Sequence, residues 1–310
     1  MTDKSRLSII TPVFDPSGQS AMHFQKTVDS VISQTNVEVT WHVSFQGENV
    51  LHRQILSAAL RDASTSTQIV IRESQALSLA EHLSEILNIT DDSYFRHILC
   101  QDDYYTFATS AQIIANSLLM CDFVHIHPFR VSGVASQELP ETRTCSMSRF
   151  SRWDGLQVRS AVNRLGGLSC LAWAGPTPWT SLDYSLYADL EIMMRFLQAN
   201  LKMMRLMGGA VTELIWQGQS QHFLKREKVD ELTRWSNCHN ATRSAKIALK
   251  GASVSAASGE PKGVEVWLQS SRHRLVPIGL VLKTVGLAAS VVFSGASKLR
   301  MNLSRFYHSQ

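Results

Sequence analysis

Two hydrophobic periodicities alternate along about the first 120 residues of the chain. Short runs rich in β-branched residues have the pattern of buried strands, and longer segments with apolar residues at every third or fourth position have that of amphipathic helices. Strands are expected over 7–13, 37–45 and 67–71, and in a run that ends at Asp102 and Asp103; helices are expected over 20–34, 50–63, 77–87 and 109–119. This alternation predicts βαβ units, and therefore an α/β protein with a mainly parallel sheet flanked by helices.

The pattern continues less regularly after this point. The elements expected there are a strand over 123–131, a loop over 132–148, a helix over 154–165, an irregular apolar stretch over 168–179, a helix over 187–201 and strands within 202–216. Residues 226–250 have the pattern of a polar helix, and 251–263 the composition of a flexible linker. We therefore expect an α/β domain over 1–225, a helical segment and linker over 226–263, and a C-terminal tail over 264–310.

Composition and charge argue against several classes of protein. The 310 residues are 44% hydrophobic and 18% charged, an ordinary globular mixture. The net charge of +4 is too small to indicate nucleic-acid binding. Five widely spaced cysteines without a Cys-x-x-Cys pair argue against a disulfide framework or a zinc site and favour a reducing compartment. Because residues 1–6 are polar and lead straight into a strand, no signal peptide is expected and the sequence predicts a cytoplasmic location.

The tail 264–310 combines apolar and basic residues. Its apolar part, 275–293, is interrupted by Lys283 and bracketed by arginines and lysines, so neither half is long enough to span a bilayer. An apolar surface flanked by cations suits the anionic cytoplasmic face of a membrane. A C-terminal helix packed against the preceding domain fits the same pattern, and both alternatives stay open.

Two adjacent carboxylates, Asp102 and Asp103, follow the apolar run 95–100 and precede two tyrosines. In an open α/β sheet, ligands collect at the carboxyl ends of strands. Two anions at that position repel each other unless a cation or hydrogen-bond donors compensate them. The pair therefore indicates either an acidic turn or a site for a hard divalent cation that also binds phosphate oxygens.

Four motifs in order carry a resemblance to a known family. They are SIITPVF at 8–14, TVDSVISQ at 27–34, LCQDD at 99–103 and ADLEIMMR at 188–195. In this order the chain resembles, over about 7–220, the family 2 inverting glycosyltransferases of the GT-A fold. That resemblance implies a GT-A sheet, a nucleotide-diphosphate sugar donor (a UDP- or GDP-sugar) and a glycan or lipid-linked saccharide acceptor, as in surface polysaccharide synthesis.

The resemblance also assigns roles to residues at the strand ends. Asp102 and Asp103 would hold Mg²⁺ or Mn²⁺ on the diphosphate leaving group, where negative charge develops during transfer. Thr11, Pro12 and Phe14 end the first strand, where the nucleotide base and ribose lie in the family. The ring of Phe14 is suited to packing against the base.

Further roles follow from position within the motifs. Asp189 matches the general base that removes the acceptor proton, and the dipole at the start of its helix would keep it ionised. Gln46 and Glu48 stand where the family usually has an acidic pair that grips the base. Gln101 is expected to belong to the donor site. Gln219 lies in the segment that approaches the diphosphate in the family.

Some positions depart from the family pattern. Cys100 replaces the first acidic residue of the Asp-x-Asp motif, and Ala188 replaces a glutamate. These losses leave open an alternative, a catalytically inactive protein that binds nucleotide sugars on the same fold. A nucleotidyltransferase is disfavoured because the loop 15–19 has no Lys or Arg to hold a triphosphate.

In three residue pairs, a functional and a structural interpretation compete. The pairs are His125 with His127 (metal ligation or packing), Trp173 with Trp179 (sugar stacking or core packing), and Glu191 with Arg195 (part of the site or a solvated salt bridge). For the histidines and tryptophans, packing is the commoner outcome.

Overall fold

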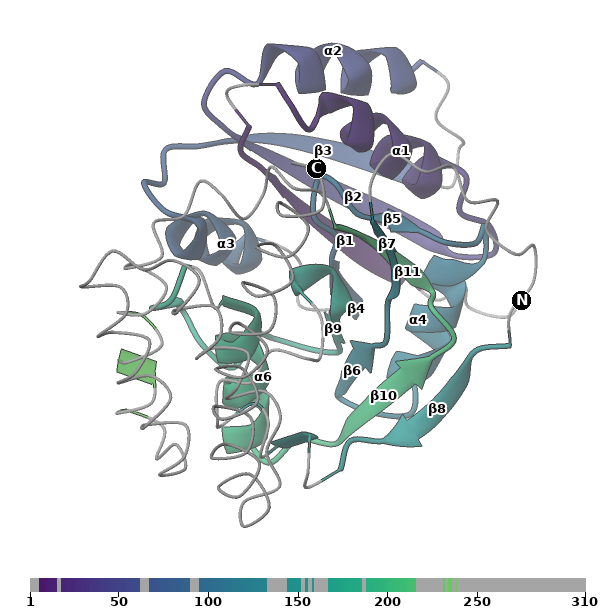
Figure 1. Cartoon of the computed structure of the whole chain (residues 1–310), viewed down its shortest axis with the longest axis vertical. Coiled ribbons are helices and arrows are strands. Elements are labelled where there is room, and N and C mark those ends of the chain that lie inside the picture. Colours follow the sequence, from purple (N-terminus) through teal and green to yellow (C-terminus); the bar gives the residue numbers. More distant parts are fainter. Residues whose placement is uncertain are drawn as a thin grey trace, which may run out of the picture.

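An eight-stranded sheet forms the centre of the computed structural model (Figure 1). Its order is β3 (Thr67–Ser74), β2 (Glu38–Gln46), β1 (Arg6–Val13), β4 (Phe95–Ile98), β9 (Leu171–Trp173), β6 (Phe123–Ile126), β10 (Met203–Met207) and β8 (Ser146–Arg149). Of these strands, β9 and β8 run antiparallel to their neighbours and the other six run in one direction. The structure describes residues 6–15, 18–61, 67–89, 95–132, 144–151, 154–155, 158, 167–185, 188–215, 231, 234–235 and 238.

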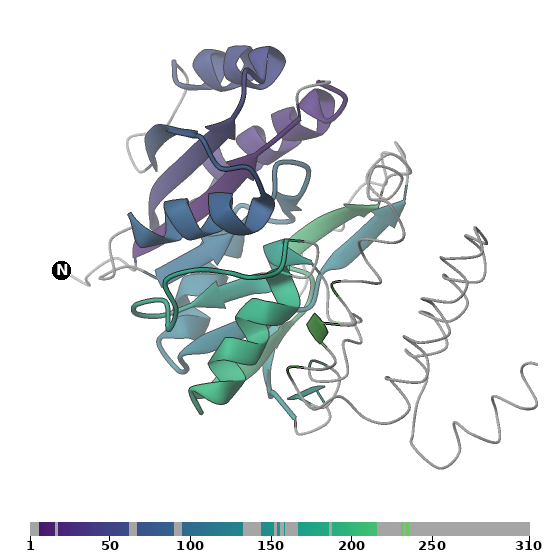
Figure 2. The same ribbon diagram turned by 90° about the vertical axis from the view of Figure 1, so that its left-hand side faces the viewer.

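Helices cover both faces of this sheet (Figures 1 and 2). Side chains alternate between faces along a strand. Accordingly, Ile9 of β1 belongs to one apolar cluster and Ile10 to the other. The first cluster packs α1 (Ala21–Ile32), α2 (Val50–Ala59) and α4 (Ser110–Leu118) on the sheet; the second packs α3 (Leu79–Asn88) and α6 (Ala188–Gln198). The sheet is therefore buried on both sides, as parallel sheets generally are.

A second, smaller sheet has the order β5 (Tyr104–Tyr105), β11 (Val211–Ile215) and β7 (Phe129–Ser132). The chain enters it from β10 through Gly208 and Gly209, which have φ of 115° and 70°. A side chain at Gly208 would also meet the backbone of Cys145 at 2.9 Å. Glycine therefore permits the sharp change of direction between the two sheets.

The strand order reverses between β1 and β4. From β1, the chain builds β2 and β3 on one side and then crosses to β4 on the other. Such a reversal leaves a crevice at the carboxyl ends of the two strands, where open α/β sheets bind ligands. The loop that follows β1 and the turn that follows β4 both lie there.

The fold confirms the predicted α/β class with a mainly parallel sheet, and it corrects three local predictions. The expected strand over 123–131 is two strands, β6 and β7, in different sheets, because Pro128 has no N–H to continue a ladder. The end of the expected loop over 132–148 forms the edge strand β8. The irregular stretch 168–179 contains a short 3₁₀ helix, Leu168–Cys170, followed by the central strand β9.

Several predicted features lie outside the described residues. They are the segments 226–263 and 264–310 apart from four isolated positions, most of the helix over 154–165, and Gln219. Among the residues that are described, no helix is both long and apolar enough to cross a membrane.

Candidate functional site

The turn after β4 is fastened to the loop after β1 by Gln101. The side-chain oxygen of Gln101 accepts a hydrogen bond of 2.9 Å from the Phe14 N–H, and its NH₂ group donates to the Ser20 hydroxyl at 3.0 Å. From α1, the Thr27 hydroxyl lies 2.9 Å and 2.7 Å from the carbonyl oxygens of Gln101 and Asp103. These bonds hold the two loops of the crevice in one fixed arrangement.

A buried polar group joins the same loop to the end of β2. The Asp15 carboxylate accepts hydrogen bonds from the Ser20 N–H and hydroxyl at 2.6 and 2.7 Å, and the Asp15 N–H donates to the Asn49 side chain at 2.8 Å. Asn49, with φ of 44°, returns a bond of 2.7 Å to the Gln46 carbonyl. His52 completes the group, 2.9 Å from the Ser20 hydroxyl. The carboxyl ends of β1, β2 and β4 are thus interlocked.

Asp103 is held by donors on both carboxylate oxygens. The Ser169 hydroxyl donates to Oδ2 at 2.6 Å and the Leu214 N–H donates to Oδ1 at 3.0 Å. Burial raises the pKa of Asp103 well above its usual range, and the charges of Asp102 and Glu213 raise it further. Through its hydrogen bond with Leu214 of β11, the Asp103 side chain joins the turn after β4 to the small sheet.

Ser169 is itself fixed by several partners. Its hydroxyl accepts from the Cys100 N–H at 2.8 Å, and its carbonyl lies 2.9 Å from His97 Nε2. A carbonyl only accepts, so Nε2 carries a proton and Nδ1 of the neutral ring accepts from the Tyr105 hydroxyl at 2.8 Å. Burial lowers the pKa of His97 to about 4, so the ring is neutral at pH 7.

Asp102 is only 4% exposed, beside Asp103 at 8%. Its charge raises the pKa values of both Asp103 and the Cys100 thiol, after the effect of burial. Negative charge thus accumulates at the turn, and an oxygen donor set of this kind fits Mg²⁺ or Mn²⁺. In the described part of the chain, no three His, Cys, Asp or Glu side chains converge as a metal site. A cation at Asp102 would therefore take most of its ligands from phosphate oxygens and water.

Glu213 is a buried member of the site that our sequence analysis missed. From β11, its carboxylate accepts hydrogen bonds from the Gly167 N–H, from the Cys170 thiol at 3.1 Å and from Arg130 Nε at 3.0 Å. A carboxylate inside the apolar run 211–216 is itself a usable signal, because a charged residue in a buried strand requires partners.

Asp189 lies in the first turn of α6 and is 6% exposed. Because β10 follows α6 and runs parallel to β1, α6 begins at the same carboxyl edge of the sheet as Asp102. The segment before α6 is fixed by Glu191, which accepts from the N–H groups of Asp183 and Tyr184 at 2.8 and 2.9 Å. Glu191 also pairs with Arg195 at 2.5 Å and is buried, so the pair is not a solvated surface bridge.

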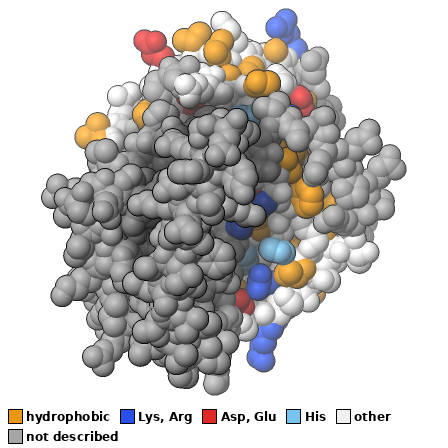
Figure 3. All heavy atoms as spheres, in the orientation of Figure 1, with side chains coloured by type: hydrophobic (Ala, Val, Ile, Leu, Met, Phe, Trp, Pro, Cys, Tyr) orange, Lys and Arg blue, Asp and Glu red, His pale blue; other side chains and the backbone are white. Residues whose placement is uncertain are grey.

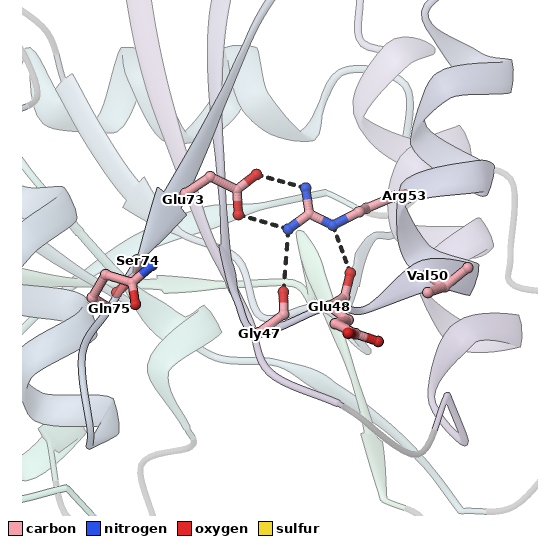
Figure 4. A pocket seen from close by; sticks show the side chains of 7 residues that line it. All are labelled: Gly47, Glu48, Val50, Arg53, Glu73, Ser74 and Gln75. Carbon is pink, nitrogen blue, oxygen red and sulfur yellow. Dashed lines mark hydrogen bonds and ion pairs between the residues drawn. The ribbon is translucent and has the colours of Figure 1, made fainter.

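A pocket of about 480 Å³ opens at the ends of β2 and β3 (Figure 4). Arg53 crosses it with a two-pronged ion pair to Glu73, at 2.6 and 2.7 Å, and with bonds to the carbonyls of Glu48 and Gly47 at 2.6 and 3.2 Å. Glu48 lines this pocket, whereas the Gln46 side chain donates to the Ala76 carbonyl at 2.6 Å.

The three predicted residues at the end of β1 differ in exposure. Thr11 and Pro12 are buried, and the Thr11 hydroxyl accepts from the Trp41 indole at 2.9 Å. Phe14 is 57% exposed, so its ring is accessible to a ligand. Of the three, Phe14 alone has an exposed side chain on which a base could stack.

Burial of the side chains decides between the interpretations of the tryptophan pair and of the histidine pair. Trp173 and Trp179 are buried, and their rings lie 5.8 and 5.4 Å from that of Phe196. They form core, and the sugar-stacking interpretation is wrong. His125 is buried against Phe150 while His127 is exposed, so the two do not share one environment.

Comparison with known proteins was made by sequence and by structure. No protein-family model and no curated protein matches the sequence. Among solved structures, residues 1–349 of TarS from S. aureus superpose with a TM-score of 0.51 at 10% identity, covering 87% of this chain and 76% of that one. The mannosyltransferase PcManGT from Pyrobaculum calidifontis, in complex with GDP-Man and Mn²⁺, gives 0.52 at 12% identity, covering 94% and 81%.

The chain has the GT-A fold. TarS 1–349 in complex with UDP-GlcNAc also matches, with a TM-score of 0.50, 11% identity and coverage of 86% and 78%. Identities this low establish the fold alone. Roles for individual residues then depend on the geometry described above.

Proposed function

We propose that this protein is a metal-dependent inverting glycosyltransferase of family 2. It moves a sugar from a UDP- or GDP-linked donor to a glycan or lipid-linked saccharide acceptor. The observation that carries the proposal is the buried Asp102–Asp103 pair at the point where the strand order reverses, fastened by Gln101 to the loop after β1. GT-A neighbours in complex with UDP-GlcNAc, or with GDP-Man and Mn²⁺, support a nucleotide-sugar donor and a divalent cation.

In this proposal, different residues hold the cation, bind the donor and accept the proton. Asp102 would hold Mg²⁺ or Mn²⁺, whose positive charge would offset the negative charge that develops on the departing diphosphate. Asp103 keeps the turn in place. On the donor side, the exposed side chains of Phe14 and Glu48 are open to a ligand, and Thr11, Pro12, Gln46 and Gln101 hold the strand ends that carry them. The Asp189 carboxylate accepts the proton of the acceptor hydroxyl, whose oxygen bonds to the anomeric carbon from the face opposite the leaving group. The carbon–oxygen bond to the diphosphate breaks, and its electron pair leaves with the nucleotide.

Substitution of the two acidic residues separates their roles. Asp189→Asn removes the proton acceptor, so kcat is expected to fall by about 10²- to 10⁴-fold while donor affinity is kept. Asp102→Ala is expected to abolish Mn²⁺-dependent donor binding. Asp29→Asn, at an exposed aspartate of α1, is the matched control and should transfer normally. Full transfer by Asp189→Asn would remove the base assignment, and donor binding by the wild type without transfer to any acceptor would favour the inactive binding protein.

We also propose peripheral attachment at the cytoplasmic membrane face through the tail 264–310. Its basic residues flank an apolar stretch, and each cation near an anionic surface contributes about 1 kcal/mol. This suits a lipid-linked acceptor. Co-sedimentation of the full chain with vesicles containing anionic lipid, and not with neutral vesicles, is the expected result. Equal behaviour with both vesicles contradicts it.

A further inference from the structure

Arg130 is a partly exposed cation at the border of the site. It lies on β7 in register with Glu213 on β11, and its Nε donates to the Glu213 carboxylate at 3.0 Å. The Arg130 side chain is 43% exposed, whereas that of Glu213 is 12% exposed. Within the described part of the chain, the two Nη groups of Arg130 make no further hydrogen bond. The guanidinium is thus held through Nε, and its Nη donors remain available.

The anchor of this arginine is rigid. Glu213 also accepts from the Gly167 N–H and the Cys170 thiol, so its position does not depend on Arg130 alone. The next residue, Leu214, donates its N–H to Asp103. Arg130 is therefore linked to the acidic turn through one ion pair, one peptide unit and one hydrogen bond. An arginine held in this way loses little conformational freedom when it binds an anion.

The negative charge around the acidic turn disfavours binding of a phosphate unless a cation compensates it. Asp102, Asp103 and Glu213 are three buried carboxylates, and a diphosphate that approaches them is repelled. His127 lies near both Arg130 and Arg205, because the charges of these two arginines act on its ring. Figure 3 shows lysine or arginine side chains and a histidine side chain gathered near the middle of this face.

We propose that Arg130 binds a phosphate group at this site, through the Nη groups that its pair with Glu213 leaves uncommitted. The planar guanidinium presents two parallel N–H donors, which match two oxygens of a phosphate. The source of that phosphate rests on the proposed function: it is either the diphosphate of the sugar donor or a phosphate carried by the acceptor. Both sources present the same chemistry to Arg130.

Titration calorimetry of the full chain with pyrophosphate, at fixed Mg²⁺, tests the proposal without requiring sugar transfer. Arg130→Gln is expected to weaken pyrophosphate binding about 10-fold or more, and Arg130→Lys by less. Since Arg130→Gln leaves the buried Glu213 without its partner, Arg130→Gln/Glu213→Gln is measured as well, because it removes both charges and keeps the net charge of the wild type. Arg6→Gln, at the amino-terminal end of β1, is the control for loss of one positive charge.

The results separate the alternatives. Weaker pyrophosphate binding in both the single and the double variant, with Arg6→Gln unchanged, supports direct contact. Unchanged binding in the double variant, or no binding by the wild type at millimolar pyrophosphate, overturns the proposal. If UDP or GDP also binds more weakly to Arg130→Gln, the phosphate belongs to the donor; if only pyrophosphate is affected, it belongs to the acceptor. A wild type that binds pyrophosphate but transfers no sugar refutes the proposed function and leaves the Arg130 site standing.

Discussion

The Asp103 carboxylate accepts a hydrogen bond of 3.0 Å from the Leu214 N–H, 111 residues further along the chain. This bond joins the turn after the central strand β4 to β11 of the small sheet. The other Asp103 oxygen accepts from the Ser169 hydroxyl, so both carboxylate oxygens are already bonded within the protein. Of the two adjacent acids, Asp102 is therefore the one we expect to act on a ligand.

Neutralising the two acids should have consequences of different size for stability. In Asp103→Asn, the side-chain NH₂ would face Ser169 or Leu214, both of which donate to the carboxylate. We expect a loss of about 1–3 kcal/mol in the free energy of unfolding, measured in urea. Asp102→Asn removes a charge that repels Asp103, which offsets part of any contact it loses, so a smaller loss is expected. An equal loss in both variants would contradict the division of roles.

Ser169 should matter through its hydroxyl. Ser169→Ala removes the donor to Asp103 and the acceptor for the Cys100 N–H, both buried. We expect destabilisation of about 1–3 kcal/mol together with weaker donor binding, because the acidic turn loses its support. The control is Ser33→Ala, just after α1, whose hydroxyl donates an exposed bond of 3.2 Å to the Ser30 carbonyl. If the two alanine variants unfold at the same urea concentration, the supporting role of Ser169 is wrong.

Gln101 should affect ligand affinity more than stability. Gln101→Ala removes the bonds to the Phe14 N–H and to Ser20, so the loop after β1 loses its link to the acidic turn. UDP or GDP affinity is expected to fall about 10-fold, which corresponds to about 1.4 kcal/mol. Calorimetry on Gln101→Ala and on Gln25→Ala, an exposed glutamine of α1, makes the comparison. Equal affinities in these two variants would remove Gln101 from the donor site.

Two buried histidines should make the protein less stable in mild acid. Burial lowers the pKa of His97 to about 4, and burial, Arg72 and Arg96 lower that of His42 to about 4. The unfolded chain, with histidines near 6.5, binds more protons between these values. Stability is therefore complete above about pH 6.5 and falls toward pH 4, by up to about 1.4 kcal/mol per pH unit for each histidine. Urea unfolding at pH 7.5 and pH 5 measures this slope, and His42→Asn should reduce it.

The alternation of strands and helices made most of the fold predictable. The run 7–13 has the pattern of a buried strand and 37–45 alternates as a strand does, and β1 and β2 agree with them closely. The position of β9 was not predictable, because three residues after a short helix carry too little periodicity. Which sheet a strand joins depends on long-range pairing, and the separation of β6 from β7 appears in the sequence only as Pro128.

The candidate site was partly predictable for a similar reason. The position of Asp102 and Asp103 after an apolar run marks the pair in the sequence. The local sequence does not show that Asp103 bonds to Ser169 and Leu214 within the protein. Ser169 sits in an apolar stretch with no motif, and its contact with Asp103 exists only in the folded chain. Glu213 did carry a signal, a carboxylate in a buried strand, although its partner Arg130 lies 83 residues away.

The most direct test of the account is donor binding with and without Mn²⁺, measured by calorimetry on the wild type and Asp102→Asn. We predict that the wild type binds a UDP- or GDP-sugar with Mn²⁺ and loses about 10-fold or more in affinity in EDTA, while Asp102→Asn binds weakly in both. Wild-type affinity that is the same with Mn²⁺ and with EDTA, or Mn²⁺-dependent binding retained by Asp102→Asn, would contradict a cation held at Asp102.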